Sequence, residues 1–187
     1  MKTIKQSTKE MIEVIKNTGL LREDVSDIEI NRLLDELEVR ETYEYVSPIN
    51  AFFLSNLESL YVSEFDDCNL YQEPNYYVKI LEEITKFSCG DISFSEISES
   101  WIESGDVILT FSVNNIPSEL EFNTQEESDV VPGEFIVFVH KSLMDYKGNS
   151  RYLSTQGVNG ENIYFRLETS IAEKVDNILK TYKSPHE

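Results

Sequence analysis

The sequence predicts an α+β fold, with a helical N-terminal part and then a mostly antiparallel sheet, made of a meander and a hairpin, packed with helices on one face. Apolar residues keep helical spacing up to Gly90, alternate with polar residues after it, and return to helical spacing near the C-terminal end. Helices that precede and follow a cluster of strands indicate this fold class. We expect a single α+β domain over residues 1–187, with residues 1–46 open to interpretation as an accessory helical hairpin.

Two capping motifs predict the N-terminal helices. Ser7-x-x-Glu10 precedes apolar residues, and Gly19 offers a left-handed stop, so a short first helix is expected between them. Ser26-x-x-Glu29 precedes a stripe of Ile and Leu at i, i+3, i+4 and i+7 spacing. This second motif predicts a helix over residues 27–40.

Two more helices are expected before the strands. Ser47-Pro48 is typical of a helix start, and an apolar face that extends to Leu60 predicts a third helix there. The segment Glu64–Glu73 is predicted to be an acidic loop. Pro74 then opens a fourth helix, which Gly90 is placed to end. Its apolar face comprises Tyr77, Ile80, Leu81 and Ile84.

A three-stranded antiparallel meander is expected after Gly90. Apolar residues at every second position predict a strand over Val107–Val113. The strand before it changes phase between Phe94 and Trp101, which requires a bulge or a bend. Asn114-Asn115 can turn the chain into a third strand around Leu120.

The last third of the chain predicts a helix, a hairpin and a helix. The segment from Pro132 to Gly148 favours a helix. Arg151–Thr155 and Asn162–Leu167 are expected to pair as a hairpin, because their connection contains glycines and Asn159-Gly160. Ser170-x-x-Glu173 is expected to cap the last helix.

Charge is zoned along the chain. From Glu41 to His140 there are twenty acidic residues and two basic ones, Lys79 and Lys86, so this segment holds a charge of −18 out of a total of −19. Ten Phe and ten Tyr residues exclude a disordered acidic tail. Such charge repels nucleic acid and anionic membranes and accelerates encounter with a basic protein. We therefore expect a basic protein as partner, and neither nucleic acid nor a membrane.

The expected location is the cytoplasm. Charged residues such as Lys9 and Glu13 interrupt any apolar run of signal-peptide length at the N-terminus. No stretch reaches the roughly 18 apolar residues of a membrane span. Cys68 and Cys89 form no CxxC motif or Cys/His cluster, which favours a reducing compartment.

No catalytic, metal-binding or cofactor-binding signature is present in the sequence. His140 has no serine or cysteine nucleophile motif to serve, so we interpret it as a partly exposed helix residue. Two groups of carboxylates lack the ligand spacing and the glycine of a calcium loop. These groups are Glu64, Asp66 and Asp67, and Glu126, Glu127 and Asp129. We expect no catalytic residue, no metal and no cofactor.

Tyrosine and acid coincide in one stretch of the sequence. Six of the ten tyrosines lie between Tyr43 and Tyr77, together with the acids of the loop Glu64–Glu73. Tyrosine offers contact area at low entropic cost and carboxylates complement Lys and Arg, so the stretch fits an interface, although Tyr77 especially is expected in the core. The candidate partner-binding residues are Glu64, Asp66, Asp67, Tyr71 and Glu73 in one loop, and Glu119, Glu121, Glu126, Glu127 and Asp129 around another.

Over residues 74–180 the layout resembles the small acidic immunity proteins that bacteria pair with polymorphic or contact-dependent toxins. The segments that carry the resemblance are Tyr76-Tyr-Val-Lys-Ile-Leu-Glu-Glu-Ile84 and Asn162-Ile-Tyr-Phe-Arg-Leu167, the latter followed by a capped helix. The resemblance implies a protein that neutralises a toxin by direct binding, at the toxin's active site or beside it. It assigns no residue to a site.

Together these observations predict a non-enzymatic acidic protein that binds a basic toxin domain, for example a nuclease. Three alternatives stay open. A carboxylate-dependent hydrolase can assemble its site from distant residues. A DNA-mimicking inhibitor places carboxylates where a duplex has phosphates. A structural subunit associates through an apolar patch, so the oligomeric state is also open.

Overall fold

The computed structural model describes residues 3–40, 48–62, 73–102, 105–124, 131–156 and 162–181. It confirms the α+β class: α-helices open the chain and two three-stranded sheets follow. Contacts divide the chain into two compact units. The first unit comprises residues 1–58 and 167–187, and the second comprises residues 59–166. The expectation of a single domain over residues 1–187 stays a prediction.

The first unit is helical. It contains α1 (Ile4–Asn17), α2 (Asp27–Arg40), the 3-10 helix η1 (Pro48–Leu54) and α5 (Thr169–Thr181). Helix α1 packs against α2, η1 and α5, and it buries one face that includes Met11, Ile12 and Ile15. The predicted boundaries of α2 are confirmed, and Ser26 Oγ accepts a hydrogen bond from the N–H of Glu29 at 3.3 Å.

The predicted start of α1 is wrong by one turn. The cap is Thr3, whose hydroxyl accepts from the N–H of Gln6, while the Gln6 side chain accepts from the N–H of Thr3. Thr3 and Gln6 therefore form the capping box that we expected at Ser7 and Glu10. Ser7 is fully buried inside the helix.

The predicted third helix is also too long. Only Pro48–Leu54 is helical, and Ser59–Val62 forms a strand, β1. The physical reason is a bridge to a distant segment: the N–H of Asn56 donates to the carbonyl of Leu20, and the N–H of Arg22 to that of Leu54. These bonds occupy backbone groups that a continuing helix would need.

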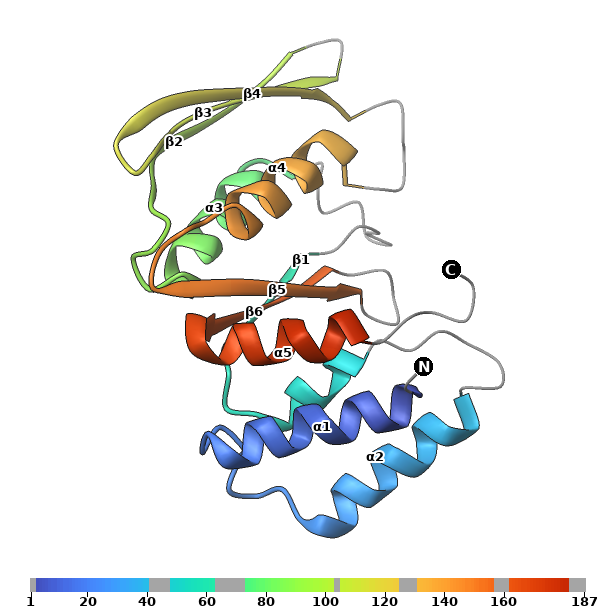
Figure 1. Ribbon diagram of the computed structural model, residues 1–187. Helices are drawn as coiled ribbons and strands as arrows, with labels where there is room; N and C mark the ends of the chain where they lie inside the picture. Colours follow the sequence, from blue (N-terminus) through green and yellow to red (C-terminus); the bar gives the residue numbers. More distant parts are fainter. Residues whose placement is uncertain are drawn as a thin grey trace. The chain divides into compact units, whose positions relative to one another are not determined.

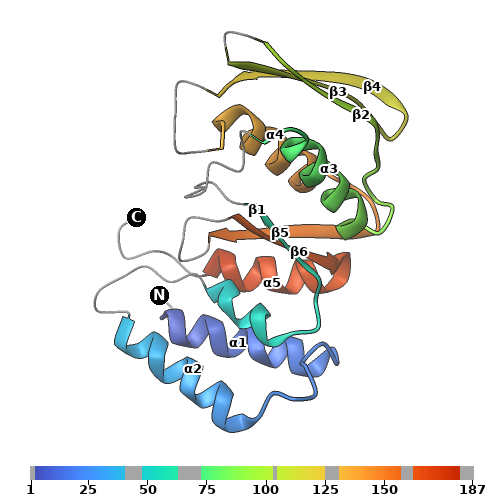
Figure 2. The same ribbon diagram turned by 180° about the vertical axis from the view of Figure 1, so that it is seen from behind.

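The second unit has three layers. Its elements are β1, α3 (Tyr76–Phe87), β2 (Phe94–Trp101), β3 (Asp106–Val113), β4 (Ile116–Asn123), α4 (Gly133–Met144), β5 (Ser150–Gln156) and β6 (Asn162–Glu168). The last two residues of β6 belong to the first unit. One sheet has the order β2-β3-β4 and the other the order β1-β6-β5. Figures 1 and 2 show α3 and α4 between the two sheets. Helix α3 contacts both β1 and β2, and α4 contacts both β4 and β5, so two sheets replace the one expected.

The meander β2-β3-β4 has the predicted bulge and turn. The register between β2 and β3 shifts between Ser95 and Ser98, where Glu96 has a φ of 54°. Asn114 and Asn115 make the turn from β3 to β4, with φ values of 50° and 67°. Two adjacent residues of positive φ are typical of a type I′ hairpin turn, whose twist matches that of the strands.

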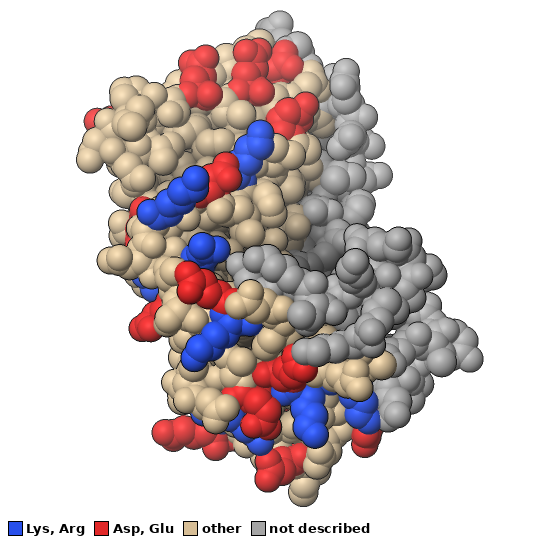
Figure 3. All heavy atoms as spheres, viewed as in Figure 1, with Lys and Arg blue, Asp and Glu red and all other residues tan. Residues whose placement is uncertain are grey.

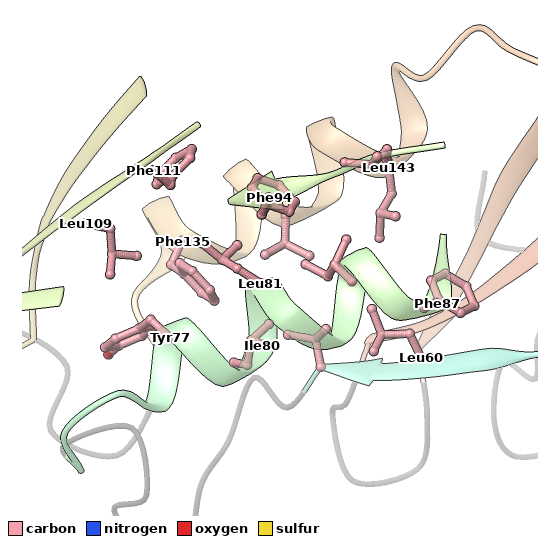
Figure 4. Packing of buried hydrophobic residues seen from close by; sticks show 14 of the residues in the cluster. Leu60, Tyr77, Ile80, Leu81, Phe87, Phe94, Leu109, Phe111, Phe135 and Leu143 are labelled. Carbon is pink, nitrogen blue, oxygen red and sulfur yellow. The ribbon is translucent and has the colours of Figure 1, made fainter. Parts of the chain in front are cut away.

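The core of the second unit is aromatic and lies between the layers. Tyr77, from α3, is fully buried, and its ring centroid lies 4.8 Å from that of Phe122 and 4.9 Å from that of Phe135. Figure 4 shows Tyr77, Phe135 and Leu109 converging from α3, α4 and β3. This packing fixes β2-β3-β4 on α3 and α4, and it leaves the other face of the sheet without a helix among the described residues.

Candidate functional site

The sheet β2-β3-β4 presents a polar face to solvent on the side opposite α3 and α4. Alternation along β3 buries Val107, Leu109 and Phe111 against the helices and directs their neighbours outward. The cross-strand register places two rows of residues on this face. We call it the outer face; its rows are Ser98, Thr110 and Glu119, and Ser100, Ile108 and Glu121.

The charge on the outer face has a single sign. Between Lys86 and Lys141 the sequence contains eleven acidic residues and no Lys or Arg. Figure 3 shows acidic side chains gathered along the top of the view, over β2-β3-β4, while Lys and Arg side chains lie lower. A surface of one sign attracts a partner of the opposite sign and repels its own copy.

Most described acids of this sheet have structural partners. Glu96 accepts a hydrogen bond from the Ser112 hydroxyl at 3.0 Å, and Asp106 accepts one from the Asn123 amide at 2.6 Å. The Glu99 carboxylate points to the inner side and accepts bonds from backbone N–H groups at the start of α3. These bonds fix the carboxylates within the unit.

Glu119 and Glu121 differ from these acids. Both side chains are exposed on β4, two positions apart and therefore on the same face. Neither makes a hydrogen bond or an ion pair with another described residue. Among the described acids of the outer face, these two carboxylates can therefore bind a partner without breaking a hydrogen bond or an ion pair within the described residues.

A second polar cluster surrounds Asp91, in the connection from α3 to β2. Its carboxylate accepts hydrogen bonds from the Tyr146 hydroxyl at 3.0 Å, from the Tyr152 hydroxyl at 3.1 Å and from Arg166 Nε at 3.0 Å. The Asp91 side chain is 14% exposed and that of Arg166 is 29% exposed. The members of this cluster bond to one another, so the cluster joins the connection between α3 and β2 to the connection after α4 and to the strands β5 and β6.

The pKa values in the Asp91 cluster follow from these contacts. Burial raises the pKa of Asp91, but hydrogen bonds from Ser150, Arg166 and Tyr146 outweigh it, and the pKa lies below its ordinary value. Burial and the negative charge of Asp91 raise the pKa of Tyr152. All these groups therefore keep their usual charge at neutral pH, which suits a structural role better than proton transfer.

The predicted partner-binding residues divide into three sets. Glu119 and Glu121 lie together on the outer face, and Glu73 is exposed just before α3. The others, Glu64, Asp66, Asp67, Tyr71, Glu126, Glu127 and Asp129, lie outside the described residues. The structure thus brings two of the ten candidates side by side.

Four other aromatic or histidine residues differ in how far they are exposed. Tyr77 belongs to the core, as expected, whereas Tyr61 on β1 is 54% exposed. Trp101 ends β2 and is 38% exposed, which places it at the rim of the core. His140 is exposed on α4.

Two further findings concern the described residues alone. No three His, Cys, Asp or Glu side chains there are gathered so that they could hold a metal ion. None of the helices in these ranges has both the length and the apolar character that a membrane crossing needs.

Comparisons of the chain with protein-family models, with curated proteins and with solved structures found no match. A function for this chain therefore has to be inferred from the outer face and its charge.

Proposed function

We propose that this protein is a non-enzymatic inhibitor that binds a basic protein through the outer face of β2-β3-β4. The observation that supports it is the pair Glu119 and Glu121, exposed on a rigid sheet within a stretch of sequence that has no Lys or Arg. The layout that resembles immunity proteins gives the proposal its class. The partner is then a basic toxin domain, and the proposed site of action is the cytoplasm.

Rigidity supports a binding role for these two carboxylates. Both residues lie in a strand whose register with β3 is continuous from Asp106 to Val113. Their backbone positions are fixed before a partner arrives, so less conformational entropy is lost on binding than in a loop.

The partner is expected to associate fast and with strong dependence on salt. Negative charge on the outer face steers a basic protein toward the sheet, and this steering is screened beyond a Debye length of about 8 Å at physiological ionic strength. The remaining affinity at high salt measures the contacts that form after encounter.

The test uses a basic protein that this chain captures from the native cell at low salt, purified and titrated at low and at high salt. The variant Glu119→Gln/Glu121→Gln should weaken binding by about tenfold or more at low salt, mainly through slower association. The matched control is Glu82→Gln/Glu83→Gln, which removes the same charge from exposed positions of α3. Equal affinity for the wild type and the first variant would refute the outer face as the binding surface.

The control also separates local from global electrostatics. If both double variants lose affinity equally, net charge alone drives association and the outer face has no special role. Inhibition is read in parallel, as protection of growth in cells that produce the basic protein. Binding without protection would exclude an inhibitor.

A further inference from the structure

The edge of β4 is open in the described part of the chain. Strand β4 pairs with β3 on one side, and the order β2-β3-β4 places it last in the sheet. An unpaired edge presents a row of backbone N–H and C=O groups that can bond to another strand.

Backbone hydrogen bonds show which residues of β4 face this open edge. The N–H of Thr124, just after β4, donates to the carbonyl of Gly105 at 3.1 Å, on the side of β3. In an antiparallel pair, successive residues direct their backbone groups alternately toward and away from the neighbouring strand. Residues 118, 120 and 122 therefore bond to β3, while Glu119 and Glu121 direct their N–H and C=O groups outward.

Pro117 agrees with this assignment. It lies two positions before Glu119, so its nitrogen also faces the open edge, where proline's missing N–H costs no ladder bond. Proline also limits how far an added strand can pair with β4, because Pro117 has no N–H to donate to a carbonyl of that strand. The usable edge runs from Glu119 toward Asn123.

Glu119 and Glu121 combine outward-facing backbone groups with charged side chains. The residues whose backbone groups face the edge are the residues whose carboxylates lie on the outer face. A strand that pairs with them antiparallel places its own side chains directly opposite these carboxylates. Between them, Leu120 is half-buried and packs against the core on the other face, so the residue opposite it lies on that apolar side.

We propose that the free edge of β4 takes an extended segment of the basic partner as a fourth strand, with Lys or Arg opposite Glu119 and Glu121 and an apolar residue between them. This proposal rests on the proposed function and specifies how the partner is bound. Main-chain hydrogen bonds supply affinity in such strand addition, and the alternate side chains supply specificity.

A second copy of this chain is a poorer occupant of the edge. Two β4 strands paired antiparallel bring the carboxylates of Glu119 and Glu121 in one copy next to those in the other. Like charges directly opposite each other destabilise a strand pair. The same carboxylates that attract a basic strand thus protect the edge from self-association.

The test uses short capped peptides in which Lys alternates with Val, titrated into the full chain and followed by hydrogen exchange of the Glu119 and Glu121 amides. The unmodified peptide should slow exchange at these two amides by about tenfold or more, because they gain partners. The Ser118 and Leu120 amides, already bonded to β3, should change little.

Two methylated peptides test the strand geometry at constant charge. Methylation of the backbone nitrogens of Lys removes the donors that face β4 and should abolish protection. Methylation of the Val nitrogens, which face away, should preserve it. Equal effects of the two methylations would overturn strand addition, even where Glu119→Gln/Glu121→Gln still weakens the peptide.

The outcomes separate this inference from the proposed function. If the peptides fail to protect the two amides while the basic protein still depends on Glu119 and Glu121, the strand-addition proposal is wrong and the inhibitor proposal stands. If neither peptide nor protein depends on these carboxylates, both proposals fail. Protection that appears without peptide and rises with protein concentration would identify a second copy as the occupant and overturn the inference.

Discussion

Glu99, on β2, caps the helix that begins beside Tyr77. Its carboxylate accepts hydrogen bonds from the backbone N–H groups of Asn75 and Tyr77, at 2.9 and 3.2 Å. Asn75 has a φ of 65° and makes no side-chain cap of its own, so the acid of the sheet supplies the missing acceptor. The same carboxylate accepts from the indole N–H of Trp101 at 2.6 Å. Glu99 therefore joins the sheet to α3 through a charged cap.

Glu99→Ala is expected to lower the free energy of unfolding by about 1–2 kcal/mol, because two backbone donors and the helix dipole lose their acceptor. Trp101 is the sole tryptophan, so its emission should shift in the folded variant as the indole loses its partner. Urea unfolding and fluorescence measure the two effects. Glu119→Ala is the control, with an expected change within about 0.5 kcal/mol; equal costs for both variants would contradict the cap.

Asp91 should give the protein a stability that depends on acid pH. Asp91→Asn replaces the carboxylate that accepts from Tyr146, Tyr152 and Arg166, and it should cost about 2 kcal/mol at pH 7. The folded pKa of Asp91 is lowered, so the contribution is fully present above the unfolded value of about 3.9 and is lost as pH falls through the folded pKa. Urea unfolding of both proteins at neutral and acid pH should show the difference shrinking in acid.

The control for this pH effect is Asp145→Asn, at the exposed end of α4. It should change stability by no more than about 0.5 kcal/mol at either pH. A difference between wild type and Asp91→Asn that stayed constant into acid would show that the lowered pKa has no part in stability.

Local pattern was sufficient to predict most elements of this fold. Apolar periodicity within a helix or strand predicted α2, β3 and the bulge in β2, because each depends on residues close in the sequence. The third helix was predicted too long because the backbone of Asn56 bonds to that of Leu20 instead of continuing a helix. No pattern inside the segment indicates that competing bond.

The roles of the acidic residues depend even more on contacts that local sequence pattern does not indicate. Alternation in β4 was enough to place Glu119 and Glu121 on one face, and both were among the candidate partner-binding residues named from the sequence. The structural acids were missed, because Glu99 bonds to a residue 22 positions away and Asp91 to one 75 positions away. Identical carboxylates in the sequence thus divide into bound and available ones according to partners that only the fold supplies.

Gly148 leaves room for the Tyr146 hydroxyl that bonds to Asp91. A Cβ at Gly148 would overlap this hydroxyl, so Gly148→Ala should displace the ring and cost about 1–2 kcal/mol. In the background of Tyr146→Phe, which has no such bond to lose, the same change should cost measurably less. Urea unfolding of the four proteins measures this coupling.

Gly133→Ala is the control for that cycle, because a Cβ there meets no atom within 4 Å among the described residues, apart from its chain neighbours and its own helix backbone, and its φ is not positive. It should leave stability unchanged within about 0.5 kcal/mol. Additive costs in the Gly148 and Tyr146 cycle would mean that the glycine does not act through the tyrosine.

Two threonines of the first unit offer a matched test of buried hydroxyl groups. Thr8, on α1, is fully buried, and its hydroxyl has no hydrogen-bond partner among the described residues. Thr18, after the same helix, donates to the carbonyl of Val14 at 2.7 Å. Thr8→Val removes a desolvated group that gains nothing on folding, so it should be neutral or raise the free energy of unfolding by about 1 kcal/mol. Thr18→Val removes a bond and should lower that free energy by about 1 kcal/mol. Both variants keep a β-branched side chain of the same shape, so urea unfolding compares the hydroxyl groups alone, and a loss at Thr8 as large as that at Thr18 would show that Thr8 has a polar partner in solution.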